Sequence, residues 1–510
     1  MSEPIYLTAD IRRIEQAAGS GALMVRAGAA AAEFAATLVP ESGKDVLVLA
    51  GPGNNGGDAF ELAAILKAQF FRVRVVSPAD LAKLPEDAAR AHGKWRAAGG
   101  EVLREPPADV RWALVVDGLF GIGLARAPQG EYAALIGYAN AQRCPVLALD
   151  IPSGLESDTG RVLEHAVRAT HTITFIALKP GLLTLEGPDC CGELRLAGLG
   201  VAARELVAPQ GWVAGPGAFR EVLRPRQRDF HKGMAGSLAI LGGAAGMIGA
   251  ALLAGRAALK LGAGRVYVGL LDAAAPGVDG SALELMLRHP DEVLGLDLDA
   301  FVVGPGLGQG ERAETLLGAV LASDIACVLD ADALNLIAEN EDLRRACARR
   351  GAETLVTPHP AEAARLLVSK TGEVQANRLA AARKISENLH AHVVLKGNGS
   401  VIVARDGHFF INTSGNPGMA SAGMGDVLSG FLGALLAQRY TGETALVLGV
   451  HLHGAAADEL VKHGDGPVGL AAGELIAPAR RIWNGWLSRP GSSAGWCVDA
   501  PRNQRWRLRM

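Results

Sequence analysis

The chain has 510 residues and a net charge of −3, and 49% of its residues are hydrophobic while 20% are charged. This length exceeds what one hydrophobic core fills, so we expect two or three domains. The slight negative charge predicts no sequence-independent binding of nucleic acid, and neither a signal sequence nor an apolar run of membrane-spanning length is expected. We therefore expect a cytoplasmic α/β protein, a homo-oligomer, whose sparse cysteines stay reduced.

The first half alternates short apolar runs with helical patterns, and this alternation predicts a Rossmann-like, doubly wound sheet. Continuous apolar runs suit parallel strands that are buried on both faces. The expected strands are 45–51, 72–77, 112–118, 145–152 and 170–177, and the expected helices include 59–69 and 131–141. We assign residues 1–210 to this first domain.

A polar, basic stretch at 224–236 interrupts the pattern, and we expect a linker at 211–223. A second α/β set follows, with strands expected at 236–243, 265–271, 299–306, 325–332, 353–360, 392–399 and 400–407, and helices near 425–437 and 443–461. This set predicts a second domain over 224–485. The last residues, 486–510, lack periodicity and are expected to form a flexible tail.

Three polar clusters follow strands of the first half, namely NNGGD (54–58), DGLFGIGL (117–124) and DIPSG (150–154). Ligands of open α/β sheets lie at the carboxyl ends of the strands, so these clusters can converge on one crevice. The first cluster overlaps a G-x-G-x-x-G pattern that begins at Gly51, which alone is a weak signal. The tip of the second strand lacks the acidic residue of a ribose site, which argues against a dinucleotide cofactor.

Asn55, Asp117 and Ser153 supply an amide oxygen, a carboxylate and a hydroxyl. Hard oxygen donors with a single charge suit a weakly charged cation better than zinc. Asp150 precedes a Pro turn at the same edge, where a half-buried carboxylate can exchange protons with a substrate. The alternative for each residue is an ordinary helix cap or turn.

Over about residues 1–205, these motifs resemble the NAD(P)H-hydrate epimerase family, whose substrates NADHX and NADPHX carry added water at C6 of the nicotinamide ring. The resemblance implies a potassium ion on Asn55, Asp117 and Ser153, and we expect Asp150 to be the catalytic proton carrier. The substrate contacts that it implies are Asn54, Asn55, Gly56, Gly57, Asp58, Gly121, Ile122, Gly123, Leu124, Ala125, Arg126, Ala127 and Asp150.

The second half contains AGMGD (422–426) at the start of a helix whose apolar residues are expected on one face. Glycines let the backbone approach an anion, and the free N–H groups of a helix start point towards it. Asp426 beside such a phosphate suits phosphoryl transfer as the base for an acceptor hydroxyl. The alternative is a glycine-rich helix contact in which Asp426 caps the first turn.

Two further motifs agree with a nucleotide site. KGNGS (396–400) is a glycine turn suited to nucleotide phosphates. TPHPAEAARLL (357–367) places His359 and Glu362 at a helix start, where Glu362 can orient magnesium through water or simply stabilise the first turn.

Six motifs occur in order over about residues 225–480, namely HKGMAGS, GPGLG, DADALN, TPHPAE, KGNGS and GMASAGMGD. This set resembles the ribokinase-like, ADP-dependent NAD(P)H-hydrate dehydratase family. One departure is Ala422, where the family usually has glycine. The resemblance implies Mg2+, ADP as co-substrate, and transfer of phosphate to the C6 hydroxyl followed by its loss, which gives NAD(P)H and AMP. Asp426 would be the catalytic base. The implied substrate contacts are Ala244, Gly306, His359 and Asp426, and the implied ADP contacts are Lys396, Gly397, Asn398, Gly399, Ser400 and Gly425.

Three other functions stay open from the residues alone. AGMGD also permits a small-molecule kinase, for example of a vitamin alcohol, with the first half as a regulatory nucleotide-binding module. A dinucleotide sensor without turnover and a nicotinamide-dependent oxidoreductase are the remaining alternatives.

Overall fold

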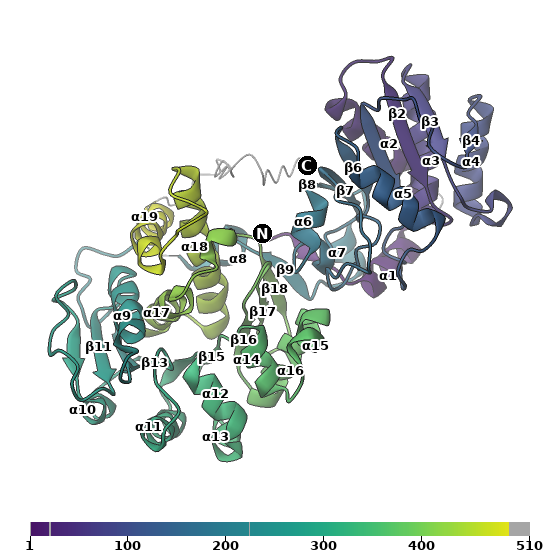
Figure 1. Cartoon of the computed structure of the whole chain (residues 1–510). Helices are drawn as coiled ribbons and strands as arrows, with labels where there is room; N and C mark the ends of the chain where they lie inside the picture. Colours follow the sequence, from purple (N-terminus) through teal and green to yellow (C-terminus); the bar gives the residue numbers. More distant parts are fainter. Residues whose placement is uncertain (1, 20–21, 224, 489–510) are drawn as a thin grey trace. The chain divides into compact units, whose positions relative to one another are not determined.

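The computed structural model describes residues 2–19, 22–223 and 225–488. The described residues form two compact units, one within residues 4–210 and the other within residues 211–488 together with residues 2 and 3, and each unit has its own sheet and core (Figure 1). A flexible tail was expected at 486–510. Its first two residues end the last helix, Ser488 follows them, and residues 489–510 lie outside the described residues.

The first unit is built on a parallel sheet with the order β4-β3-β2-β5-β6-β7-β8. Its strands are β2 (Asp45–Ala50), β3 (Arg72–Val76), β4 (Val102–Leu103), β5 (Leu114–Gly118), β6 (Val146–Leu149), β7 (His171–Phe175) and β8 (Glu193–Ala197). The strand order reverses between β2 and β5, which is where an open α/β sheet forms its ligand crevice. The predicted doubly wound sheet is therefore confirmed.

Helices cover both faces of this sheet. Val46 and Val48 pack into one core with α1 (Thr8–Ala18), α2 (Leu23–Leu38), α3 (Asn54–Ala68) and α4 (Glu86–Ala97). Leu47 and Leu49 point the opposite way and pack with α5 (Glu131–Asn140). The short elements are β1 (Pro4–Ile5), η2 (Leu81–Lys83), η3 (Pro180–Leu182), α6 (Gly187–Cys191) and α7 (Ala203–Leu206).

Helix α3 begins at Asn54, whereas the sequence predicts its start at residue 59. The NNGGD cluster therefore forms the first turns of the helix and not a loop. Close packing outweighs the low helix propensity of glycine here. A Cβ at Gly56 would lie 2.1 Å from the Gly51 carbonyl oxygen, and one at Gly57 would lie 2.7 Å from Met24 Sδ.

The strands of the second unit belong to a larger mixed sheet, in which they follow the order β9-β18-β17-β16-β15-β14-β13-β10-β11-β12. Its strands are β9 (Gly211–Ala214), β10 (Ser237–Gly242), β11 (Arg265–Leu270), β12 (Met286–Arg288), β13 (Ala300–Val303), β14 (Ala326–Leu329), β15 (Thr354–Val356), β16 (His392–Leu395), β17 (Val401–Val403) and β18 (Phe409–Asn412). Pairs from β12 across to β16 are parallel, and β17 is antiparallel to both its neighbours.

Residues 211–223, expected to be a linker, contain β9 and the turns α8 (Pro216–Phe219) and η4 (Arg220–Val222). Strand β9 pairs in parallel with β18, from Gly211 opposite Phe409 to Ala214 opposite Asn412. This segment is therefore hydrogen-bonded into the second sheet, because its apolar residues form a strand that was not predicted from the sequence.

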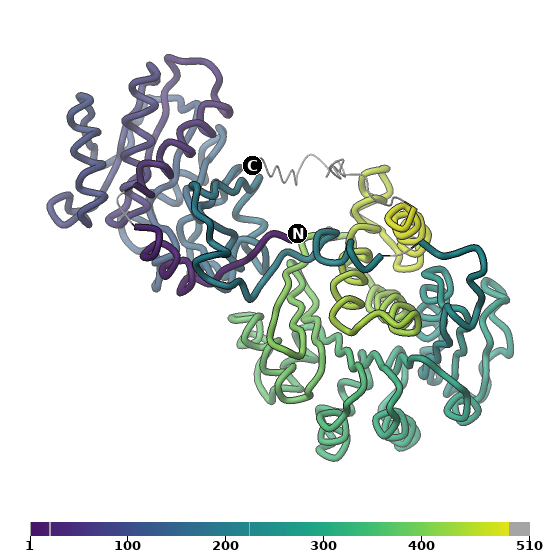
Figure 2. Tube along the Cα trace, turned by 180° about the vertical axis from the view of Figure 1, so that it is seen from behind, coloured from purple at the N-terminus to yellow at the C-terminus, as the bar shows by residue number. Residues whose placement is uncertain are grey.

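Two layers of helices enclose the second sheet (Figures 1 and 2). One layer contains α9 (Ile248–Lys260), α17 (Met424–Ala437) and α18 (Gly442–Lys462), and the other contains α11 (Glu311–Leu321), α12 (Asp332–Glu339), α13 (Glu341–Ala348), α14 (Pro360–Leu366) and α16 (Arg378–Leu389). The remaining elements are α10 (Pro290–Leu294), α15 (Thr371–Ala376), η5 (Pro417–Met419), η6 (Ala472–Leu475) and α19 (Ile476–Leu487).

Helix α17 is buried on every side from Val427 to Ala437, whereas the sequence predicts a single apolar face. The helix lies against both the sheet and α9. At Gly430 the two helices approach so closely that a Cβ would lie 2.2 Å from the Ala254 carbonyl oxygen. The glycines of this helix therefore permit its central position.

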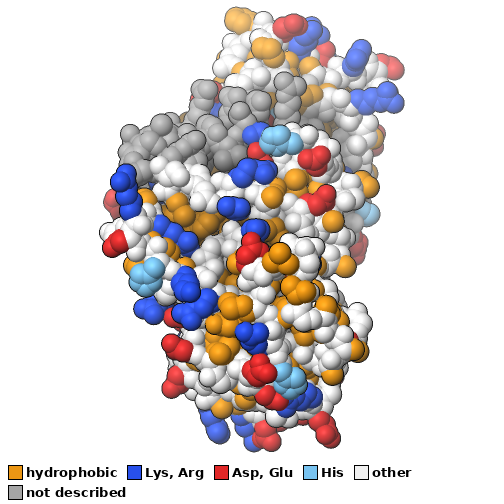
Figure 3. All heavy atoms as spheres, turned by 90° about the vertical axis from the view of Figure 1, so that its left-hand side faces the viewer, with side chains coloured by type: hydrophobic (Ala, Val, Ile, Leu, Met, Phe, Trp, Pro, Cys, Tyr) orange, Lys and Arg blue, Asp and Glu red, His pale blue; other side chains and the backbone are white. Residues whose placement is uncertain are grey.

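Figure 3 shows Lys and Arg side chains scattered among Asp and Glu side chains on one face of the molecule. This mixed distribution agrees with the net charge of −3. No helix in the described part of the chain combines the length and apolar character needed to cross a bilayer.

We expect Gly430→Ala to lower the free energy of unfolding by about 1–3 kcal/mol, because the added methyl must push α17 away from α9. Gly485→Ala is the matched control, since a Cβ there meets nothing within 4 Å and alanine favours a helix by about 0.5–1 kcal/mol. Urea denaturation of the whole chain, followed by circular dichroism, measures both. Equal stability of Gly430→Ala and the parent chain would contradict the close approach.

Candidate active sites

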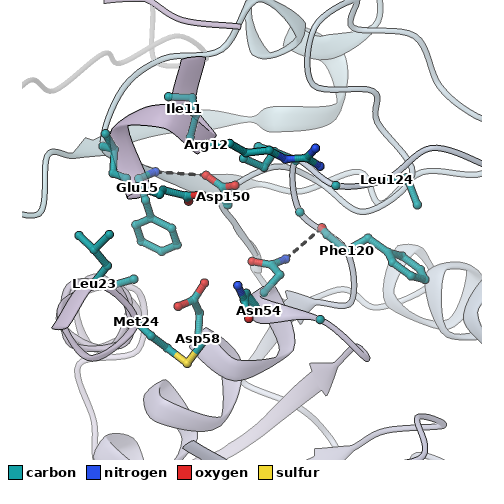
Figure 4. Close-up of a pocket in the computed structure, with 18 of the residues that line it drawn as sticks. Ile11, Arg12, Glu15, Leu23, Met24, Asn54, Asp58, Phe120, Leu124 and Asp150 are labelled. Atoms are coloured by element: carbon teal, nitrogen blue, oxygen red, sulfur yellow. Dashed lines mark hydrogen bonds between the residues drawn. The ribbon is translucent and has the colours of Figure 1, made fainter. Parts of the chain in front are cut away.

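A cavity of about 550 Å³ opens at the carboxyl ends of β2 and β5 in the first unit (Figure 4). Its walls come from α1, the first turns of α3, the loop after β5, and the residues that follow β6 and β7. The cavity therefore lies at the reversal of strand order. Two of the three polar clusters, at 54–58 and 117–124, contribute walls, and the third contributes Asp150.

Asp150 follows β6 with a φ of 62°, the left-handed region that a non-glycine residue adopts only when its surroundings enforce it. Its N–H donates to the Ile173 carbonyl oxygen at 2.7 Å, which fixes the backbone. Figure 4 shows its carboxylate at the cavity wall. The strand end and the backbone turn together aim this side chain at the cavity, as the sequence predicts.

Lys179 is fully buried and was missed by the sequence analysis. Its Nζ donates to Asp150 Oδ1 at 2.5 Å, to Thr174 Oγ1 at 2.8 Å and to the Phe175 carbonyl oxygen at 2.9 Å. All three of its donors are therefore used. A lysine between a strand and a Pro-Gly turn was the only available signal.

Two more carboxyl groups, Glu15 and Asp58, line the same cavity (Figure 4). Burial and the nearby Asp150 and Glu15 carboxylates raise the pKa of Asp58 well above its ordinary value. Burial and Asp150 also raise the pKa of Glu15. Glu15 comes from α1 and had no signal beyond an amphipathic pattern.

Asn55, Asp117 and Ser153 lie together beneath the loop after β5. Ser153 Oγ donates to Asp117 Oδ1 at 2.6 Å and accepts from the Phe120 N–H at 2.8 Å. Asn55 Nδ2 donates to the Phe120 carbonyl oxygen at 2.9 Å, while its buried Oδ1 accepts no hydrogen bond from a described residue. Burial raises the pKa of Asp117 to about 6.

The remaining predicted contacts of the first unit divide into two groups. Those that line the cavity are Asn54, Asn55, Asp58, Gly121, Ile122, Gly123, Leu124, Ala125 and Arg126. Gly56, Gly57 and Ala127 are not among its lining residues, and the first two serve the packing of α3. A Cβ at Gly121 would lie 3.5 Å from Asp150 Oδ2 and 3.4 Å from Asn55 Cγ. The Gly121 backbone therefore lies next to both of these side chains.

The second unit has a similar pair, formed by Asp330 after β14 and Lys396 after β16. Lys396 Nζ donates to Asp330 Oδ1 at 2.9 Å, and Ser429 Oγ donates to Asp330 Oδ2 at 2.8 Å. Asp330 is 1% exposed. Burial opposes its ionisation, yet the Lys396 ammonium and the hydrogen bonds hold its pKa below the ordinary value.

Gly425 and Asp426 lie directly beside this pair, in the first turn of α17. A Cβ at Gly425 would lie 3.3 Å from Asp330 Oδ2 and 3.4 Å from Lys396 Nζ. Burial and the Asp330 carboxylate raise the pKa of Asp426 to about 6, against the lowering effect of Lys396. The first N–H groups of α17, the Lys396 ammonium and the Asp426 carboxyl group thus lie close together. Helix N–H groups and an ammonium are suited to binding an anion.

The loop 396–400 is held by Arg378, another residue that was not predicted from the sequence. Arg378 is 2% exposed, and it donates to the Asn398 and Leu395 carbonyl oxygens at 3.0 Å each. A Cβ at Gly397 would lie 2.6 Å from Arg378 Nη1. The guanidinium therefore fixes the shape of the glycine turn.

His359 caps α14, because its Nδ1 accepts from the Glu362 N–H at 3.3 Å. In return, the His359 N–H donates to Glu362 Oε2 at 2.7 Å. The helix-stabilising role considered for Glu362 is thus present. Glu362 Oε2 also lies 4.0 Å from Lys396 Nζ, so the same side chain faces the anion site.

Ala244 and Gly306 are brought together, because the Ala244 N–H donates to the Gly306 carbonyl oxygen at 2.7 Å. Their loop adjoins the end of β14, since a Cβ at Gly304 would lie 1.8 Å from the Asp330 carbonyl oxygen.

Known proteins resemble the chain in both units. The family model described as YjeF-related protein N-terminus matches residues 20–181, and the one described as NAD(P)H-hydrate dehydratase matches residues 238–476. The bifunctional NAD(P)H-hydrate repair enzyme Nnr of Escherichia coli is 38% identical over 94% of each chain. The chain belongs to the bifunctional NAD(P)H-hydrate repair enzyme family.

Two further similarities accompany this match. The repair enzyme Nnr of Coxiella burnetii is 38% identical over 94% of this chain and 99% of its own length. Among solved structures, the ADP/ATP-dependent NAD(P)H-hydrate dehydratase of Bacillus subtilis, crystallised with ATP and Mg2+, is 29% identical over 54% of this chain and 98% of its own, with a TM-score of 0.48.

We expect Lys179→Met to lower the free energy of unfolding by about 3–5 kcal/mol, because it leaves the partly buried Asp150 carboxylate without its cation. The double variant Lys179→Met, Asp150→Asn removes that charge and is expected to be more stable than Lys179→Met alone. Urea denaturation of the single and double variants measures the coupling. Additive losses would show that the ion pair does not act as a unit.

Proposed function

We propose that the chain repairs NADH and NADPH that have been hydrated at C6 of the nicotinamide ring. The first unit interconverts the R and S epimers of NADHX and NADPHX, and the second unit dehydrates the S epimer with ADP. The observation that carries this proposal is the match to bifunctional repair enzymes over 94% of the chain, which spans both candidate sites.

Epimerisation requires that C6 break its bond to the hydroxyl oxygen or to the ring nitrogen and remake it on the other face. Either route moves a proton, and Asp150 is the carrier that we propose. Its partner Lys179 donates a hydrogen bond to Asp150 Oδ1 and places a buried cation beside this carboxyl group. The cavity-lining residues named above would contact the dinucleotide.

The donor set of Asn55, Asp117 and Ser153 fits a potassium ion. Asn55 Oδ1 is buried and has no hydrogen-bond donor among the described residues, so it retains an acceptor for a cation. Asp117 supplies a compensating charge beside it. A bound potassium ion would offset negative charge on the pyrophosphate, and the three side chains would position the loop after β5.

In the second unit, the N–H groups at the start of α17 and the Lys396 ammonium would hold the phosphates of ADP. The turn 396–400 would follow the nucleotide. Asp426 would take the proton of the C6 hydroxyl while the oxygen attacks the terminal phosphorus. Loss of phosphate from C6 and of a proton from C5 then restores the dihydropyridine and leaves AMP.

Magnesium would neutralise phosphate charge in this step, and Glu362 would orient it through water. Ala244, Gly306 and His359 are the proposed contacts of the hydrated ring. Asp330 touches Lys396 and Ser429, and it acts by positioning them.

Incubation of hydrated NADH with the whole chain and ADP is expected to restore the absorbance of the dihydronicotinamide. With Asp150→Asn, NADH is expected to be restored quickly from the S epimer alone. Recovery should then fall to the rate of spontaneous epimerisation, because the R epimer must first convert to the S epimer. Asp426→Asn is expected to abolish recovery.

Chromatography of the nucleotides separates this function from a small-molecule kinase, since repair yields AMP and phosphate without a phosphorylated product that persists. Asp45→Asn, at the start of β2, serves as the control with unchanged kinetics. No recovery with either ADP or ATP would refute the proposal.

The dehydration rate should depend on pH through Asp426, whose pKa is raised to about 6. The ionised form is the base, so kcat/KM is expected to fall about tenfold per pH unit below that pKa. Asp330→Asn removes the neighbouring charge that raises this pKa, and the acid limb should move to lower pH. An acid limb that stays in place or moves upward would contradict the assignment.

A further inference from the structure

The cavity of the first unit holds more carboxyl groups than its buried cation can neutralise. Glu15, Asp58 and Asp150 all line it, and Lys179 is the lysine among its lining residues (Figure 4). Lys179 is bound to Asp150 and to two neutral acceptors. Because like charges repel, the Asp150 carboxylate opposes ionisation of Asp58 and Glu15 in the free protein.

Asp58 is the group best placed to keep its proton. Among the described residues, it has neither a hydrogen-bond donor nor an ion-pair partner, in contrast to Asp150. Burial and the carboxylates around it raise its pKa well above the ordinary value. Burial and Asp150 raise the pKa of Glu15 as well, but both Lys179 and the exposed Arg12 act to lower it, whereas Lys179 alone does so for Asp58.

The charged groups around Asp58 come from every element that packs near it. They are Arg12 and Glu15 from α1, Glu61 from α3, Asp87 from α4, Arg126 from the loop after β5, Asp150 after β6 and Lys179 after β7. Two of these carboxylates have cation partners on α4, since Glu61 pairs with Lys94 and Asp87 pairs with Arg90. Of the cations in this set, Lys179 acts directly on Asp58, and it is already committed to Asp150.

We propose that Asp58 is a second catalytic carboxyl group of the epimerase, a neutral proton donor that works with the Lys179-bound Asp150 carboxylate. This inference rests on the epimerase function proposed above. It assigns the acid and the base to different elements, with Asp58 on α3 and Asp150 after β6, so that the two groups can serve a C6 centre from separate sides of the cavity.

The step balances without a further reagent. Asp58 gives its proton to the C6 hydroxyl oxygen, the C6–O bond breaks, and the lone pair of the ring nitrogen forms a C=N bond. The departed group is water. A water molecule then adds to the other face of C6, the C=N pair returns to nitrogen, and Asp150 takes the proton from the added water. Exchange with solvent returns the proton from Asp150 to Asp58.

Reversal of the reaction uses the same groups with exchanged roles, as microscopic reversibility requires. The iminium formed between the two steps differs from NADH only by a proton at C5. A site that placed an additional base at C5 would dehydrate the substrate. The two carboxyl groups are therefore expected to act on oxygen alone, and restored NADH should not accumulate without ADP.

The test follows the conversion of the purified R epimer of NADHX to the S epimer by chromatography, with the whole chain, without ADP, and over a range of pH. Asp58→Asn is expected to slow conversion by about 10²–10⁴-fold and to remove the alkaline fall in rate that deprotonation of Asp58 causes. Asp58→Glu restores a carboxyl group and should recover part of the rate together with that alkaline limb.

Asp45→Asn removes a carboxylate at the opposite end of β2, paired with Arg72, and is the matched control with an unchanged rate. Thermal denaturation of Asp58→Asn should show a midpoint no lower than that of the parent chain, because no partner of Asp58 is lost.

Two outcomes would overturn the proposal. One is an Asp58→Asn rate equal to that of the parent chain, and the other is a slowed variant that keeps the parental alkaline limb. Failure of the parent chain itself to interconvert the epimers would instead refute the epimerase function, which keeps the two failures distinct.

Discussion

A lysine ammonium paired with a carboxylate at the end of a parallel strand, with one of the two groups fully buried, is the interaction on which both candidate sites depend. Lys179 holds Asp150 in the first unit, and Lys396 holds Asp330 in the second. Burying two charges costs free energy unless further hydrogen bonds satisfy them. Each pair meets this condition, because Lys179 has two neutral acceptors and Asp330 has the Ser429 hydroxyl as a second donor.

Each pair also leaves a second carboxyl group nearby with a raised pKa. Asp58 fills this position in the first unit and Asp426 in the second, and both lie near the start of a helix that follows a glycine. One lysine cannot neutralise two carboxyl groups, so the second carboxyl group of each unit has a raised pKa. The two units reach this arrangement with unrelated sequences and different sheets.

The sequence predicted the parts of both sites that lie at strand ends, because parallel strands carry their following residues to one edge. Asp150, Asp117 and Ser153 converge in this way, and so do the elements around Asp426. Lys179 and Arg378 could not be predicted, since lysine and arginine are usually exposed and each meets its acceptors only after folding. The start of α3 and strand β9 were missed because tertiary packing outweighed local propensity there.

The close approach of α17 to α9 at Gly430 has a mechanical consequence. A helix enclosed on all sides has little room to slide or tilt, so under the proposed function the amide groups at its start would form a rigid surface for a bound phosphate. Entry and release of a nucleotide would then depend on the surrounding loops and not on movement of this helix. Mutations that speed product release should be sought in those loops. Substitutions that loosen the packing of α17 should chiefly weaken catalysis.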